Sequence, residues 1–177
     1  MGYRVSTVGH IDVKPALNDE EYEYLTAFAE SRRWSRLQGP LWVPSSPFSF
    51  GEDEDEVAAT TDEVNQPPGG QPGLWCPWIP GCRGSCLQIR DDGTDGKNYG
   101  IVPWLQYLID TFLRPDAAAK GKAEFETFTF DHVVSGVIAA HRSDNGELWL
   151  VRAKDNQVRH DTLRPGDPYD WLDERSA

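Results

Sequence analysis

The chain has 177 residues, a formal net charge of −12 and 38% hydrophobic residues. Its length fits one domain with a proper core. Its acidity argues against binding nucleic acid or an anionic membrane, because both need Lys and Arg to neutralise charge. No apolar run reaches the roughly 18 residues of a membrane span, and Met1–Val13 lacks the layout of a signal peptide, so we expect a cytoplasmic protein.

The first predicted elements are a strand at residues 3–13 and an amphipathic helix after Pro15. Apolar and polar side chains alternate along the strand, which is typical of a sheet with one buried face. Asn18 and Glu21 have the spacing of a helix-capping box. The residues expected to face the core are Tyr3, Val5, Thr7, Gly9, Ile11 and Val13 in the strand, and Tyr22, Leu25, Phe28 and Ala29 in the helix.

Residues 37–73 contain no Lys or Arg and many Pro, Gly, Ser and acidic residues. Because this composition buries too little apolar surface to offset chain entropy, we interpret it as an insertion within one domain at residues 1–158. Its apolar residues either contact a partner or fold back over the core. The candidates for partner binding, here and just beyond, are Trp42, Phe48, Glu52, Asp53, Glu54, Asp55, Glu56, Trp75 and Trp78.

The three cysteines are clustered, with the spacing C-x5-C-x3-C for Cys76, Cys82 and Cys86. Structural zinc normally takes four ligands, so these residues would need a histidine to complete a metal site. An odd count in a cytoplasmic protein argues against a disulfide framework. A zinc site, a Cys82–Cys86 bridge and reduced thiols are all open, with reduced thiols favoured, and we expect no cofactor.

The second half of the chain predicts short strands around one further helix. A helix at residues 101–114 has an apolar stripe, and Pro103 fits its first turn. The Asn145-Gly146 pair is a standard hairpin-turn signal. Strands are expected at Leu74–Ile79, Cys86–Arg90, Phe125–Phe130, Val133–His141 and Glu147–Ala153, and residues 159–177 are interpreted as an extended C-terminal tail.

Two strand-then-helix units in this order predict an α+β fold. We expect a mostly antiparallel sheet of four to six strands with two helices on one face, arranged as a ferredoxin-like or split βαβ sandwich.

Residues that could carry chemistry are dispersed, and no phosphate-binding loop, HExxH or GxSxG motif is present. His10 and Asp12 are two residues apart on one strand face, and a carboxylate beside an imidazole can tune a general base. His10, Asp12 and His132 are therefore the candidate catalytic residues. A ferredoxin-like arrangement would allow His10, His132 and His141 to lie together at one site.

Several segments resemble a group of small actinobacterial and phage proteins that has no established activity. The shared patterns are G-x-I-x-V-x-P-x-L, Q-P-x-L-W-C and P-W-L-x-Y-L-I-D-x-F-L. They lie in Gly9–Leu17, Gln71–Cys76 and Pro103–Leu113, with a further similar segment at Gly136–Val158. The resemblance implies a shared fold and supplies no catalytic residue.

The size and charge are typical of immunity proteins and of phage inhibitors of host enzymes. We therefore expect a non-catalytic protein-binding module that acts on a protein with a basic surface, towards which its acidity would steer it. One alternative is a small-molecule-binding enzyme that uses the His10–Asp12 pair. A second alternative is a structural subunit of an assembly. The sequence does not determine the oligomeric state.

Overall fold

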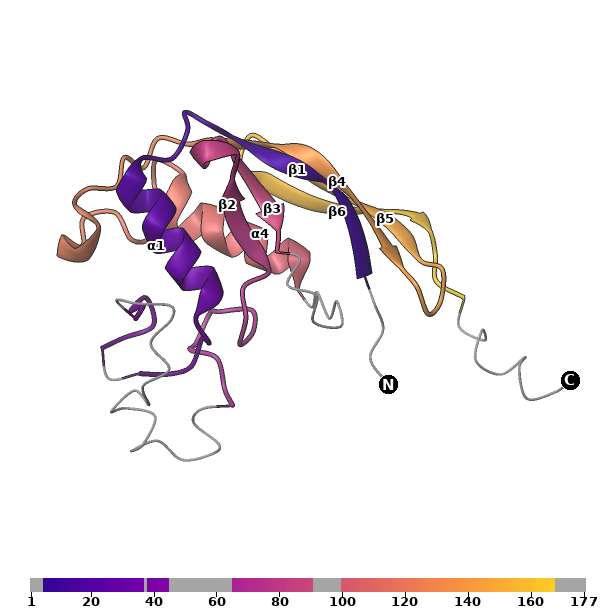
Figure 1. The fold of residues 1–177 in the computed structure, drawn as a ribbon, viewed down its shortest axis with the longest axis horizontal. Coiled ribbons are helices and arrows are strands. Elements are labelled where there is room, and N and C mark those ends of the chain that lie inside the picture. The colour runs from indigo at the N-terminus through magenta and orange to yellow at the C-terminus, as the bar shows by residue number, and fades with distance from the viewer. Residues whose placement is uncertain (1–4, 37, 45–64, 91–99, 168–177) are drawn as a thin grey trace, which may run out of the picture.

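A computed structural model describes residues 5–36, 38–44, 65–90 and 100–167 of the chain (Figure 1). These residues form one six-stranded sheet and two α-helices. A π-helical turn, Ile109–Leu113, directly follows the second helix. In chain order the elements are β1 (Val5–Lys14), α1 (Asp19–Glu30), β2 (Trp78–Gly81), β3 (Cys86–Ile89), α4 (Ile101–Leu108), β4 (Val133–Arg142), β5 (Leu148–Lys154) and β6 (Gln157–Arg164).

The sheet places strands that are far apart in sequence side by side. Its order is β2-β3-β1-β4-β5-β6, and every neighbouring pair is antiparallel. It follows that β1 and β2 run in the same direction with β3 between them, and that β3 and β4 do so with β1 between them. Figure 1 shows α1 and α4 on the same side of the sheet. The predicted α+β class, with an antiparallel sheet and two helices on one face, is confirmed.

β1 lies inside the sheet and shows the difference between its two faces. Ile11 and Val13 are fully buried, whereas Val8 is 75% exposed, as the alternation of the sequence predicts. Gly9 has a φ of +111°, and a Cβ at this position would lie 2.8 Å from the carbonyl oxygen of Val137. A side chain at this position would therefore clash with the backbone of β4, and glycine avoids the clash.

α1 begins at the predicted cap. The Asn18 side chain accepts a hydrogen bond from the Glu21 backbone N–H, and the Glu21 carboxylate accepts one from the Asn18 N–H, each at 2.8 Å. Both halves of the capping box are therefore present. Leu25, Phe28 and Ala29 are buried as predicted, so this face of the helix packs on the sheet.

The prediction of a strand at Phe125–Phe130 is wrong. The segment starts at the end of a short 3-10 helix, Ala123–Phe125, and Phe130 has a φ of +48°, which breaks an extended backbone. Phe125, Phe128 and Phe130 are nevertheless buried, and the rings of Phe125 and Phe128 pack edge-on against Tyr24 of α1. The alternating aromatic residues therefore fill the core from an irregular loop, which explains why the pattern resembled a strand.

Other boundaries shift without changing the architecture. The strand expected from Leu74 begins only at Trp78, and the helix expected to residue 114 is α-helical to Leu108. β6 forms an additional strand that runs to Arg164. Residues 159–164, which the sequence placed in the tail, thus belong to the sheet.

Candidate functional site

The face of the sheet opposite α1 and α4, which we call the open face, carries most of the exposed apolar side chains. Five large hydrophobic residues are exposed among those that the structure describes, and Trp75 is one of them. Val8, Val133 and Val137 follow the open-face alternation of β1 and β4, and Leu163 lies at the irregular end of β6, where the register with β5 shifts. Exposed apolar residues gathered on one face indicate an interaction surface.

Strand pairing makes part of this apolar surface continuous. Val8 of β1 lies opposite Ala139 of β4, and Ala139 lies opposite Leu150 of β5. Val137 is the next residue on the same face of β4, opposite His10. The patch therefore crosses three strands at the middle of the sheet.

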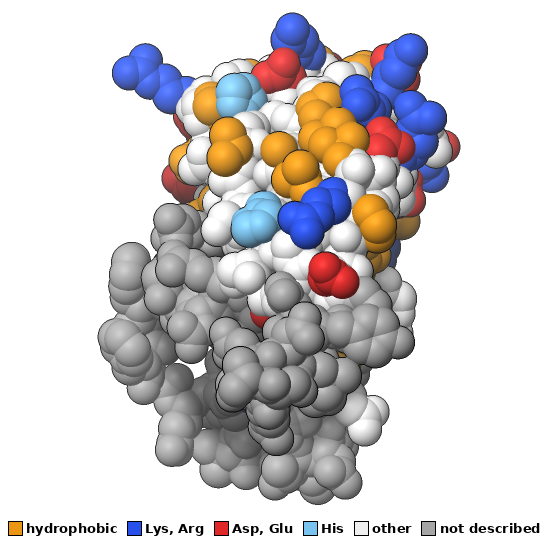
Figure 2. Space-filling view, turned by 90° about the vertical axis from the view of Figure 1, so that its right-hand side faces the viewer, with side chains coloured by type: hydrophobic (Ala, Val, Ile, Leu, Met, Phe, Trp, Pro, Cys, Tyr) orange, Lys and Arg blue, Asp and Glu red, His pale blue; other side chains and the backbone are white. Residues whose placement is uncertain are grey.

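The charge on the open face differs in sign from that of the whole chain. Arg152 and Asp161 form an ion pair at 2.8 Å across β5 and β6, so they cancel locally. The remaining charged residues at open-face positions of β1, β5 and β6 are four basic residues and one acidic residue: Lys14, Lys154, Arg159, Arg164 and Asp12. Figure 2 shows apolar side chains among Lys, Arg and His, together with some Asp and Glu, on the side of the molecule that lies on the right in Figure 1.

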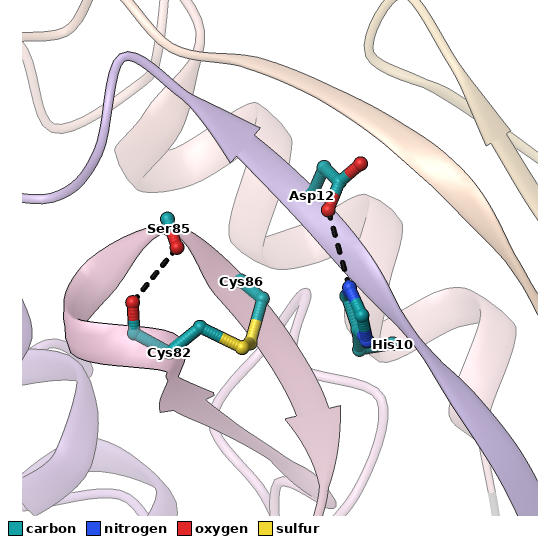
Figure 3. Close-up of a disulfide and its surroundings, with 5 residues drawn as sticks. All are labelled: His10, Asp12, Cys82, Ser85 and Cys86. Carbon is teal, nitrogen blue, oxygen red and sulfur yellow. Dashed lines mark hydrogen bonds and ion pairs between the residues drawn. A yellow bond between two sulfur atoms is a disulfide. The ribbon is translucent and has the colours of Figure 1, made fainter.

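The predicted His10–Asp12 pair is present on this face. His10 Nε2 lies 3.3 Å from Asp12 Oδ1, and about half of each side chain is exposed. Asp12 is opposite Cys86 of β3, and Figure 3 shows the pair beside the bridge between Cys82 and Cys86. The pair is open to solvent, but a general base also needs a substrate held within hydrogen-bond reach.

His132 lies away from the open face, in a buried ion pair with Glu21. Its Nε2 is 3.1 Å from a Glu21 carboxylate oxygen, and its Nδ1 is 2.8 Å from the Pro15 carbonyl oxygen. Both neighbours are acceptors, so both ring nitrogens carry protons and the imidazole is charged. The other Glu21 oxygen accepts from the Thr129 N–H and hydroxyl. His132 therefore ties the loop after the phenylalanines to the start of α1.

Two opposing effects set the pKa values of this pair. Burial alone would raise the pKa of Glu21, but hydrogen bonds from His132, Asn18 and Thr129 and the charge of His132 lower it to about 2. Burial alone would lower the pKa of His132, but the Glu21 carboxylate and the Pro15 carbonyl raise it. The ion pair is thus preferred over its neutral form.

The contact between Glu21 and His132 was not predicted from the sequence. Glu21 was recognised only as a capping residue, and His132 only as a catalytic candidate. They are 111 positions apart, so no local pattern links them. Because His132 is fully buried, it does not join His10 or His141 at a common site.

The cysteines are divided between a bridge and a buried thiol. Cys82 and Cys86 form a disulfide, so the favoured expectation of reduced thiols is wrong for these two residues, while Cys76 is free and buried. Burial raises the pKa of the Cys76 thiol to about 12, so this side chain is a neutral core residue at physiological pH. In the part of the chain that the structure describes, no group of three or more His, Cys, Asp or Glu side chains is arranged to hold a metal.

The candidate partner-binding residues occupy different environments. Trp75 is 49% exposed, whereas Trp78 is buried and its indole N–H donates to the Ile101 carbonyl at 2.7 Å. Trp78 is therefore a core residue, because its ring is buried and its N–H has a hydrogen-bond acceptor. Trp42 is half-buried, and its carbonyl accepts from Arg33 at 2.9 Å. Phe48 and Glu52, Asp53, Glu54, Asp55 and Glu56 lie outside the described residues.

A pocket of about 220 Å³ lies where the start of α4 meets β4, β5 and β6. Its polar lining includes Arg142, Glu147 and His160, and Trp149 stacks on the His160 ring. Neither His10 nor Asp12 lines it, so the pocket does not supply the substrate site that this pair would need.

Comparison of the chain with protein-family models, with curated proteins and with solved structures finds no match. Within the described residues, no helix has the length and apolar character to cross a membrane.

Proposed function

We propose that this protein is a non-catalytic protein-binding module that holds its partner on the open face of the sheet. The observation that carries the proposal is the exposure of Val8, Val137 and Val133 on the one face that the helices leave uncovered, with Val8 and Val137 near each other on neighbouring strands. Burial of such side chains is a main source of binding free energy in protein complexes.

The partner that fits this face presents apolar side chains together with acidic groups. On the open face Lys154 lies at the end of β5, Arg159 lies in β6 and Lys14 lies at the end of β1. Complementary charge around an apolar centre favours correct docking and excludes like-charged surfaces. A partner with a basic surface, expected from the net charge of −12, would instead be attracted by the acidic run in the sequence at residues 52–56.

The strand order supports a ferredoxin-like core for this module. β1, α1, β2, β3, α4 and β4 follow each other in the chain, and their strands have the spatial order β2-β3-β1-β4. Each helix thereby connects two strands that run in the same direction with one strand between them, which is the split βαβ arrangement. On this proposal β5 and β6 are additions that widen the open face.

Affinity capture from a lysate of the source organism, with matched variants, tests the proposal. Val137→Asp places a charge in the apolar patch, and Trp75→Ser alters the exposed aromatic residue that lies elsewhere. We expect the wild-type chain and Trp75→Ser to capture the same protein, and Val137→Asp to lose it, because the carboxylate would be desolvated at the interface. Circular dichroism must show that both variants are folded.

Three outcomes would overturn the proposal. Equal capture by Val137→Asp and the wild type would show that the open face is not used. Loss of capture by Trp75→Ser alone would place the interface at Trp75. A wild-type dimer in sedimentation that Val137→Asp converts to a monomer would show that a second copy covers the face.

A further inference from the structure

We infer that the Cys82–Cys86 disulfide is a thiol–disulfide exchange site that reacts with a thiol of the glutathione class. The inference is independent of the proposed protein binding, since it rests on the loop between β2 and β3. Three features of this loop carry it: the unequal exposure of its two cysteines, the short span of the bridge, and the backbone bonds that hold the loop without the bridge.

The two cysteines of the bridge differ in accessibility. Cys82 is exposed, whereas Cys86 is 1% exposed. Gly81 makes room for the buried sulfur, because a Cβ at Gly81 would lie 3.1 Å from Cys86 Sγ. An incoming thiolate can therefore reach Cys82 and not Cys86, and exchange depends on this access. The exposed residue is the one to be attacked, and the buried one is the leaving group.

The bridge constrains little of the unfolded chain. Its cysteines are only four positions apart, and the entropy that a cross-link removes grows with the length of the loop it closes. A bridge over so few residues therefore stabilises the fold little, and stabilisation alone does not explain its presence. Exposed disulfides are the ones that serve as labile or catalytic bridges.

The loop is held in place by hydrogen bonds that do not involve sulfur. The Leu17 N–H donates to the Gly84 carbonyl at 3.0 Å, and the Val13 N–H donates to the Ser85 carbonyl at 2.9 Å. Within the loop, the Ser85 hydroxyl donates to the Cys82 carbonyl at 2.7 Å, as Figure 3 shows. The bridge can therefore open without release of the loop from β1.

The exchange balances as two successive displacements. The thiolate of the first thiol attacks Cys82 Sγ, the bond between the two sulfurs breaks, and Cys86 leaves as a thiolate that takes a proton from water. A second thiol then attacks the mixed disulfide at the sulfur of the first, and Cys82 is released as a thiol. In total, two thiols are oxidised to one disulfide and the protein bridge is reduced to two thiols.

Two single variants test the assignment with oxidised glutathione as the probe. Cys86→Ser leaves the exposed Cys82, which we expect to form a mixed disulfide seen by mass spectrometry. Cys82→Ser leaves the buried Cys86, which we expect to react at least about tenfold more slowly, because its access is blocked. Cys76 is present in both variants as a buried internal reference. Equal rates at Cys82 and Cys86 would overturn the assignment of roles.

Reduction of the wild-type chain supplies the second measurement. We expect reduced glutathione to open the bridge in the folded protein, and circular dichroism to show the same fold before and after. If reduction requires denaturant, or if the reduced chain unfolds, the bridge is structural and the inference fails. Dithiothreitol, a small dithiol, serves as a parallel probe, and reduction by it but not by glutathione would overturn the assignment to a glutathione-class thiol.

Discussion

The two faces of the sheet carry similar aliphatic residues, but one face is buried and the other is exposed. Ile11, Ile138 and Val151 lie under the helices and are fully buried, while Val8 and Val137 on the other face are 75% and 41% exposed. Aliphatic residues thus occur on both faces of β1 and β4. The difference between the faces arises from which one α1 and α4 cover. Apolar residues that the fold leaves uncovered are the ones available for binding.

The largest loss of stability is expected on the side of the sheet that the helices cover, at the buried pair of Glu21 in α1 and His132 before β4. Glu21→Gln removes the carboxylate and leaves a charged imidazole buried without its partner. We expect the free energy of unfolding to fall by about 3–5 kcal/mol, measured by urea denaturation. Glu20→Gln changes an exposed carboxyl in the same helical turn and is expected to cost less than about 0.5 kcal/mol. Similar losses in the two variants would contradict a special role for the buried pair.

The same ion pair predicts how stability depends on pH. The pKa of Glu21 is lowered from 4.5 to about 2, so its contribution is present above pH 4.5 and is lost as the pH falls towards 2, by about 3 kcal/mol. The pKa of His132 is raised from 6.5, so its contribution is present below pH 6.5 and is lost as the pH rises through the raised value.

The pair therefore contributes most between about pH 4.5 and 6.5. Urea denaturation across a pH series measures this, with Glu21→Gln as the control. We expect the difference in unfolding free energy between wild type and variant to shrink towards low pH. A difference that stays constant down to about pH 2 would contradict the assigned Glu21 pKa.

The smallest effect compares two adjacent residues of β4. Ile138→Val removes one methylene from the covered face and is expected to cost about 1 kcal/mol. Val137→Thr keeps the branched shape on the open face and is expected to change the unfolding free energy by less than about 0.5 kcal/mol. Thermal unfolding of the two variants measures the difference. A larger loss for Val137→Thr would mean that something covers the open face in the isolated protein.

The local features of the sequence predicted the local structure well. The capping box of Asn18 and Glu21, the alternation of β1 and the Asn145-Gly146 turn between β4 and β5 all follow from interactions within a few residues. The alternating aromatic residues at 125–130 led to the wrong prediction of a strand, because the same alternation arises where a loop places aromatic rings in the core. The bridge between Cys82 and Cys86 was one of three alternatives, since spacing does not reveal which sulfurs meet.

What the sequence determined by itself is the α+β class, the position of most strands and which side chains of β1 face the core. These properties depend on the period of the side chains and on short-range hydrogen bonds. Only the tertiary structure decided which face the helices cover, that His132 meets Glu21, and that Cys86 is buried while Cys82 is exposed. These facts depend on contacts between residues distant in the chain, where the free energy comes from packing and desolvation that no local pattern encodes.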